Sequence, residues 1–430
     1  MPDVAIGLVA IAVSIGLIAY GVPIGLALGL CALVGIAIVA GPPVALAMLK
    51  TAPYELAANW EFSAIPMFIL MGTVAFHSGM TQSLFRAGRL WLGFLPGGLA
   101  VATNYACAGF GAASGSSLAT TIAMCRLTVP EMRRYGYDPG LATGVVAAAG
   151  TLGSMIPPSV LMVIFGIFAE VSIPKLFLAG IVPGVLTAAV YSLMIVVRCR
   201  ANPSLAPAPD TTEDPNEKWR ALAEIWPLPL LILAVIGSIY TGVATATEAG
   251  ALGTVTALLI ALARRTLTWK ILYDSLLDSL INTAAIFFIA VGAVLLTRLL
   301  SFCGVPAFLT DIMLQWSVDP LLLILATAVL YLILGCLLDP LGMIFLTLPI
   351  IIPMYQALDV NLIWLGVLVV KFVEIGLMTP PVGMNVFAVK TLNPDIPISV
   401  IFKGVSWFLL CELAILAALI AFPQMTLLFV

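Results

Sequence analysis

Two adjacent prolines occur twice inside long apolar stretches, in GSMIPPS at 153–159 and in GLMTPPV at 376–382. Proline has no amide hydrogen and clashes with the carbonyl four residues earlier, so each pair interrupts a helix. In a bilayer the freed carbonyls need a polar side chain, water or a cation, unless the prolines only kink the helix for packing. The freed carbonyls are those of Gly153, Ser154, Gly376 and Leu377. Carbonyl oxygens are hard ligands, so both breaks predict a place for a cation such as sodium.

Two stretches rich in small residues have the composition of turns between half-helices. The first is GFGAASGSSLAT at 109–120, where Ser114, Ser116 or Ser117 could cap the returning helix. The second is GCLLDPLGM at 335–343, where Asp339 is followed by a proline suited to the first helical position. Half-helices that end at such tips direct N–H groups at the membrane midplane, where an anion would bind. One tip facing one broken helix, made twice, predicts two cation sites beside one anion site.

Four polar residues near the second tip and the second break leave alternatives open. A charged Asp339 at membrane depth must face protein, water or an ion. Its partner could be sodium, shared with the freed carbonyls, or Lys371, or it could simply cap its half-helix. Lys371 and Glu374 lie one turn apart, so they could pair with each other or contact substrate. Asn385 follows the second break by one turn and could face the pocket.

The composition describes a membrane protein. The 430 residues are 62% hydrophobic and 9% charged, and the mean hydropathy is +1.17. Apolar stretches long enough to cross a bilayer recur throughout, which predicts a polytopic all-α chain. The N-terminus has no basic residue before its apolar run, so we expect a retained helix and no cleaved signal peptide.

The residues that would support enzymatic chemistry are few. The seven cysteines are scattered, without a CxxC pair, and His77 is the single histidine, so we expect buried cysteines and a structural His77. One histidine with no acidic pair argues against an enzyme, and no GxxxxGK[ST] phosphate loop for ATP occurs. A channel is also disfavoured, because hairpins that meet at the midplane would block a pore.

Three sequence markers recur at nearly one spacing. The proline pairs are 223 residues apart, LTVP at 127–130 recurs as LTLP 219 residues later, and SIPKLF at 172–177 recurs loosely 223 residues later. Chance recurrence in an Ile/Leu/Pro-rich chain is the alternative to an internal duplication. We predict a first repeat, 1–198, a cytoplasmic linker, 199–222, and a second repeat, 223–430. The predicted hairpins are 98–125 and 321–352, and the predicted broken helices are 141–168 and 362–389.

The distribution of Lys and Arg predicts the orientation. Basic residues concentrate in the loops 198–220 and 264–270, whereas the turn 241–245 has none, so those two loops are expected to be cytoplasmic. Both termini are then periplasmic. The hairpin 98–125 enters from the cytoplasm and 321–352 from outside, so the halves have inverted topology, an arrangement typical of transporters. The basic residues that fall outside are Lys50, Lys175 and Arg298.

Across essentially its whole length the chain resembles the large membrane (M, DctM-like) subunit of TRAP transporters, the tripartite ATP-independent periplasmic transporters. The matching motifs are AIPMFILMG at 64–72, GFGAASGSSLAT, EMRRYGYDPGLATGVVAAAGTLGSMIPPSVLMVIFG at 131–166, LFLAGIVPGVL at 176–186, TATEAGALG at 245–253 and GLMTPPVGMNVFA. The resemblance implies an elevator transporter in the bacterial inner membrane. It implies sodium as the coupling ion, no cofactor, and symport of an organic acid such as a C4-dicarboxylate.

The resemblance also implies partners and site residues. A periplasmic binding protein would deliver the acid, and a small membrane subunit would be a separate chain, with no role for nucleic acid. The alternative is a single-component sodium/anion symporter of related fold. The implied first sodium site is Ser114, Ser116, Gly150, Gly153 and Ser154. The implied second site is Gly335, Asp339, Gly376, Leu377 and Thr379. The implied substrate residues are Ser114, Gly115, Ser159 and Asn385. Ile156 stands where the second half has Thr379, so the first site lacks that hydroxyl.

Overall fold

The computed structural model describes residues 2–207 and 215–430, and every regular element in these ranges is a helix. Two short 3-10 turns, Trp60–Ser63 and Pro203–Leu205, accompany the α-helices. Before residue 208 the helices are α1 (Pro2–Ala19), α2 (Ile24–Val39), α3 (Pro42–Ala58), α4 (Ala64–His77), α5 (Met80–Leu92), α6 (Gly98–Ser114), α7 (Ser117–Arg134), α8 (Pro139–Ala149), α9 (Leu152–Met155), α10 (Val160–Ala169) and α11 (Ile173–Ala201).

The second part of the chain has a similar sequence of helices. They are α12 (Pro215–Glu224), α13 (Pro227–Tyr240), α14 (Ala246–Ala263), α15 (Trp269–Cys303), α16 (Val305–Gln315), α17 (Pro320–Gly335), α18 (Pro340–Ala357), α19 (Leu362–Met378), α20 (Met384–Leu392), α21 (Ile398–Ala421) and α22 (Gln424–Leu427). Among the described residues, seven helices are long and apolar enough to span a membrane, or eight if the bent pair around 156–159 is one span. The chain is therefore a multi-pass membrane protein.

Both predicted hairpins are present. In the first, α6 and α7 pack against each other and are joined at Gly115, whose φ of +63° is a left-handed conformation that glycine adopts without strain. In the second, α17 and α18 pack together and are joined by residues 336–339. The first hairpin is longer than expected, because α7 continues as a helix to Arg134 through Pro130 rather than ending at residue 125.

Both predicted broken helices are present as well. The helix α8–α9 ends at Met155, and α10 leaves the break at an angle of 41°. The second helix, α19, ends at Met378, and α20 begins again at Met384. Each proline pair lies in the non-helical segment, as the missing amide hydrogens require. The two halves therefore contain the same hairpin and broken-helix pairs, in the same order.

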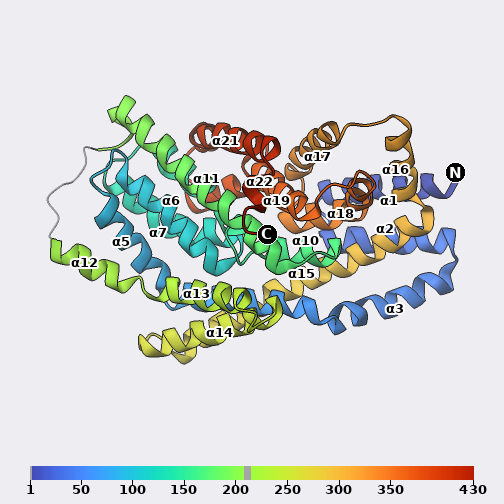
Figure 1. The fold of residues 1–430 in the computed structure, drawn as a ribbon, viewed down its shortest axis with the longest axis horizontal. Helices are drawn as coiled ribbons and strands as arrows, with labels where there is room; N and C mark the ends of the chain where they lie inside the picture. The colour runs from blue at the N-terminus through green and yellow to red at the C-terminus, as the bar shows by residue number, and fades with distance from the viewer. Residues whose placement is uncertain (1, 208–214) are drawn as a thin grey trace.

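Long helices run beside these four elements. Figure 1 shows α3, α13, α14 and α15 along one side of the molecule, with the hairpins and broken helices on the other. The helix α15 has 35 residues and packs against α1, α2, α3 and α4, so it ties the two halves together. Hydropathy alone missed α3, α5, α12 and α16, because these shorter helices join the predicted spans or lie between them.

The basic residues of the inner loops gather at one end of the chain's fold. Arg86 of α5 pairs with Glu217 and Glu224 of α12, at 3.0 and 3.3 Å, and Arg264 donates to Ser83 at 3.1 Å. Arg133 lies 2.7 Å from Asp395, and its guanidinium lowers the pKa of that exposed carboxyl. The segments assigned to the cytoplasmic side therefore contact one another. The predicted division at 198 and 223 stays a prediction, and residues 208–214 of the predicted linker lie outside the described residues.

Candidate functional site

The tip of the first hairpin contacts the break in the first broken helix. The amide of Val160, the first residue of α10, donates to the carbonyl of Gly115 at 3.3 Å. A Cβ added to Gly115 would lie 2.8 Å from the carbonyl oxygen of Pro158, so no larger residue fits there without a shift. The sequence predicted this tip-to-break contact, and the absence of a side chain at Gly115 allows it.

Hydroxyl and carbonyl oxygens converge where α9 meets this tip. The Thr120 hydroxyl donates to the Ser116 carbonyl at 2.8 Å and lies 2.8 Å from the Ser114 hydroxyl. A Cβ on Gly153 would lie 2.6 Å from the Thr120 hydroxyl and 2.7 Å from the Ser116 carbonyl. Gly150 approaches the next residue, Thr121, in the same way. The structure thus brings together four of the five residues assigned to the first sodium site, around the unanticipated Thr120.

Ser154, the fifth residue of that set, points elsewhere. Its carbonyl accepts a hydrogen bond of 2.5 Å from the Ser159 hydroxyl, so a side chain satisfies a carbonyl that the prolines freed. Its hydroxyl lies 2.8 Å from the Thr151 carbonyl and 3.2 Å from Oε1 of Glu374. Ser159 also caps α10 by accepting from the Met162 amide at 3.4 Å. Substrate binding by Ser159 stays a prediction, and in this structure its hydroxyl holds the break together.

The second hairpin and the second break meet through glycines. A Cβ on Gly335, the last residue of α17, would lie 2.6 Å from the Cα of Gly376. The hydroxyl of Thr379 donates to the carbonyl of Ile375 at 2.6 Å, and its amide donates to that of Gly376 at 3.3 Å. This threonine, absent from the equivalent position in the first half, therefore closes the end of α19. A sodium site formed by Leu377 and its neighbours stays a prediction.

Asp339 is the N-cap of α18. Its Oδ1 accepts from the amide of Gly342 at 2.7 Å, and Pro340 occupies the first helical position. The capping geometry is as the sequence indicated. The alternative that Lys371 neutralises Asp339 is wrong, because the ammonium of Lys371 binds other groups.

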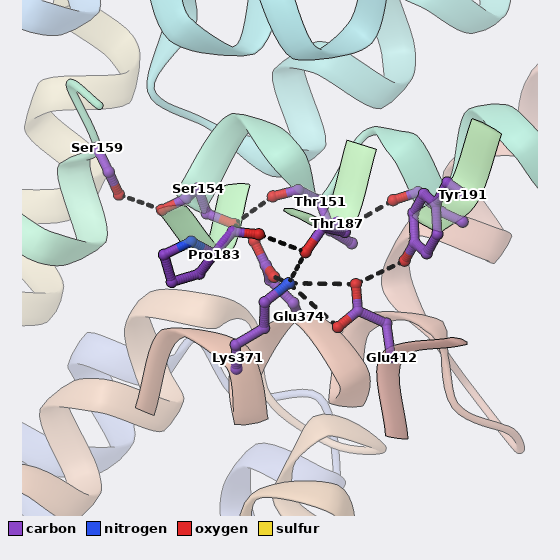
Figure 2. Close-up of polar contacts among 10 residues, drawn as sticks. Thr151, Ser154, Ser159, Pro183, Thr187, Tyr191, Lys371, Glu374 and Glu412 are labelled. Carbon is purple, nitrogen blue, oxygen red and sulfur yellow. Dashed lines mark hydrogen bonds and ion pairs between the residues drawn. The ribbon is translucent and has the colours of Figure 1, made fainter. Parts of the chain in front are cut away.

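Lys371 lies in a buried polar cluster that Figure 2 shows. Its Nζ lies 2.8 Å from Glu374, 3.1 Å from Glu412 of α21, and 2.9 Å from the hydroxyl of Thr187 in α11. The predicted pairing with Glu374 is confirmed. Glu412 was not expected to take part, and it also accepts from Tyr191 at 2.7 Å. The side chains of Lys371, Glu374 and Glu412 have no solvent-exposed surface.

Asn385 connects the second half to the first. Its Nδ2 donates to the Ser117 hydroxyl at 2.9 Å and to the Ala147 carbonyl at 3.1 Å. The residue is completely buried, and its Oδ1 has no partner in the described part of the chain. Asn385 therefore lies beside the first hairpin, as a pocket residue would, although its contact with substrate stays a prediction.

The important residues that the sequence reasoning missed had signals of two kinds. Glu412 is a lone acid in the apolar run SWFLLCELAIL, where an ionisable group is a functional candidate by default. Thr120 and Thr121 directly follow the tip, one turn after its serines. The outcome for His77 is as expected, since it lies 2.8 Å from Asp278 of α15. All seven cysteines are free and at least half-buried or nearly so.

Comparison with known proteins agrees with this architecture. The family model of the tripartite ATP-independent periplasmic transporter DctM component matches residues 11–425. The "C4-dicarboxylate TRAP transporter large permease protein DctM" of Pseudomonas aeruginosa is 32% identical over 377 residues, 87% of each chain. The "Isethionate TRAP transporter permease protein DctMQ" of Oleidesulfovibrio alaskensis is 34% identical over 336 residues, 76% of this chain and 52% of that protein.

A solved structure has a similar fold. The Alcanivorax borkumensis YdaH transporter, described as having an unusual topology, superposes with a TM-score of 0.60 over 89% of both chains, at 14% identity. That likeness concerns the fold alone, whereas the family match covers nearly every residue. The chain therefore belongs to the DctM component family of tripartite ATP-independent periplasmic transporters, and it is a transporter permease rather than an enzyme.

Proposed function

We propose that this chain is the permease that carries a small organic acid across the bacterial inner membrane, driven by sodium and fed by a periplasmic binding protein. The observation that carries the proposal is the oxygen cluster at the first hairpin tip. Ser114, Ser116 and Thr120 place two hydroxyls and a carbonyl against Gly153 of the broken helix. Uncharged oxygens of this kind suit a hard monovalent cation.

The paired construction of the two halves supports an elevator mechanism. Each hairpin packs on its broken helix through glycine, with Gly111 against Gly153 and Gly335 against Gly376. Backbone contact without side chains makes each pair a closely packed unit that could move as one body. The long helices α2, α4, α14 and α15, which pack on one another, would be the surrounding scaffold.

The substrate class rests on the relatives. The names of two of them specify a C4-dicarboxylate and isethionate, which are both small organic acids with a negative charge. An anion fits the half-helix that begins at Ser117, because its free amides and its dipole favour negative charge. We propose Ser114, Gly115, Ser159 and Asn385 as substrate residues, and a separate small membrane subunit as a partner.

Reconstituted uptake tests the function. The purified chain, the small subunit and the binding protein are placed in liposomes with the acid that the binding protein retains. An inward sodium gradient should drive accumulation without ATP. Equal uptake with potassium in place of sodium would reject sodium coupling. Full uptake without the binding protein would favour a single-component symporter.

A further inference from the structure

Lys371, Glu374 and Glu412, the buried triad, have one more acidic group than basic groups. All three side chains are completely buried, and they come from α19 and α21. If both carboxyls were ionised, the triad would hold a net charge of −1 in the protein interior. A buried uncompensated charge costs several kcal/mol, and a group in that position neutralises instead.

The hydrogen bonds identify Lys371 as an ammonium. Its Nζ has three kinds of partner: the Thr187 hydroxyl, Glu374 and Glu412. The Thr187 hydroxyl spends its own proton on the carbonyl of Pro183 at 2.8 Å, so it must accept from Lys371. Three contacts that all require a donor need the three protons of an ammonium group.

Glu412 is the carboxyl best placed to be ionised. Both of its oxygens lie within 3.2 Å of the Lys371 Nζ, and the Tyr191 hydroxyl donates to Oε1 at 2.7 Å. These contacts give it the donors that a carboxylate requires. Lys371 and Glu412 therefore already form a neutral pair.

Glu374 is the carboxyl that lacks a donor. Its Oε2 accepts from Lys371, but its Oε1 faces only the Ser154 hydroxyl, at 3.2 Å. That hydroxyl has one proton and lies closer, at 2.8 Å, to the Thr151 carbonyl, which can only accept. With the hydroxyl proton directed at Thr151, the remaining contact needs a proton on Oε1 of Glu374.

We propose that Glu374 is a proton-binding site, and that its carboxylic acid donates to Ser154 across the contact between the two broken helices. The proton joins α19 of the second half to α9 of the first, as the dashed lines between Glu374, Ser154 and Thr151 in Figure 2 trace. Loss of this proton would turn the Ser154 hydroxyl away from Thr151 and leave a buried negative charge. Protonation and the packing of the two broken helices are thereby linked.

The other groups near α19 offer no second compensating charge. Tyr191 of α11 and Cys411 of α21 are the remaining titratable side chains beside the triad, and both are neutral at pH 7. Of the other described helices that pack on α19, α9, α10 and α22 contain no titratable residue. In the rest, Tyr331 contacts Thr347, Tyr355 contacts Thr327, Lys390 donates to the carbonyls of Pro394 and Ile396, and Asp339 caps its own helix.

Infrared spectroscopy tests the proposal directly, with glutamate that is isotopically labelled at its side-chain carboxyl. Exposed glutamates are ionised at pH 7, so only a buried acid contributes a protonated carbonyl band. We expect a label-shifted acid band in the wild type that is lost in Glu374→Gln and kept in the matched control Asp339→Asn. Ser154→Ala should move the band, because it removes the acceptor of the acid proton. Absence of the band in the wild type, or its persistence in Glu374→Gln, would overturn the proposal.

Thermal unfolding gives a second readout that a merely structural glutamate would not produce. Glutamine at 374 keeps an acceptor for Lys371 and a donor for Ser154, so we expect the wild-type Tm near pH 5. The folded wild type holds a proton that an unfolded glutamate releases above a pKa of about 4.3, so its stability falls as pH rises. Its Tm should therefore drop below that of Glu374→Gln between about pH 5 and pH 8. Parallel pH profiles for the two proteins would contradict the proposal.

Discussion

Gly111 and Gly153 pack backbone against backbone: a Cβ on Gly111 would lie 2.6 Å from the Cα of Gly153. Gly335 and Gly376 repeat the relationship in the second half, at the same 2.6 Å. Each pair joins the first helix of a hairpin to a broken helix. Since the sequence around the two pairs differs, the shared contact is the strongest structural sign that the halves are related.

Alanine at Gly111 should therefore destabilise the protein. The added methyl overlaps the backbone of α9, which cannot move aside as a side-chain end could, and overpacking of this kind costs about 1–3 kcal/mol. Thermal unfolding in detergent, followed by tryptophan fluorescence, measures the loss. Gly16→Ala is the matched control, because no heavy atom lies within 4 Å of its new methyl. Equal Tm values for the two variants would show that the close approach is unimportant.

Asp339→Asn separates the two remaining roles of that residue. Asparagine caps a helix about as well as aspartate, so the variant should keep the wild-type stability. If Asp339 also binds sodium, the loss of its charge should raise the sodium concentration for half-maximal uptake. Asp339→Ala is the comparison, because it also loses the hydrogen bond to Gly342 and about 1 kcal/mol of capping stability. Unchanged sodium dependence in Asp339→Asn would leave Asp339 as a cap alone.

Ser114→Ala should weaken sodium binding more than it weakens folding. The change removes a hydroxyl that lies 2.8 Å from Thr120, and one lost hydrogen bond is worth about 1 kcal/mol. We expect uptake to require more sodium while the Tm falls only slightly. Ser301→Ala is the control, since this exposed serine bonds only the carbonyl one turn earlier in α15. Wild-type sodium dependence in Ser114→Ala would make the tip a structural turn.

The orientation can be tested with single cysteines introduced into a cysteine-free background. Ser204→Cys should resist an impermeant thiol reagent added to the periplasmic side, and Lys50→Cys should react. Both positions are exposed in the structure, so burial does not explain a difference between them. The expectation follows from the basic residues gathered around α5, α7 and α12. Labelling of Ser204→Cys from the periplasm would invert the topology.

Local chemistry was enough to predict the hairpins, the breaks and one ion pair. Paired prolines interrupt a helix wherever it packs, and Asp339 followed by Pro340 caps one by rules that involve only neighbouring residues. Lys371 and Glu374 share a helix face, so their pairing also followed from spacing. The same approach missed α3 and α5, because short helices with mixed polarity resemble connecting loops when only hydropathy is considered.

Contacts between the two halves were decided by the tertiary structure. Ser154 and Glu374 are 220 residues apart, and no local rule indicates that a hydroxyl in one broken helix meets a carboxyl in the other. The same holds for Glu412, which takes the place beside Lys371 that the sequence left open to Asp339. Hydropathy and spacing specify which residues are buried, whereas the partner of a buried charge depends on how helices distant in sequence pack together. Packing also decided that Ser159 satisfies the Ser154 carbonyl, since the turn at the break brings that hydroxyl back to it.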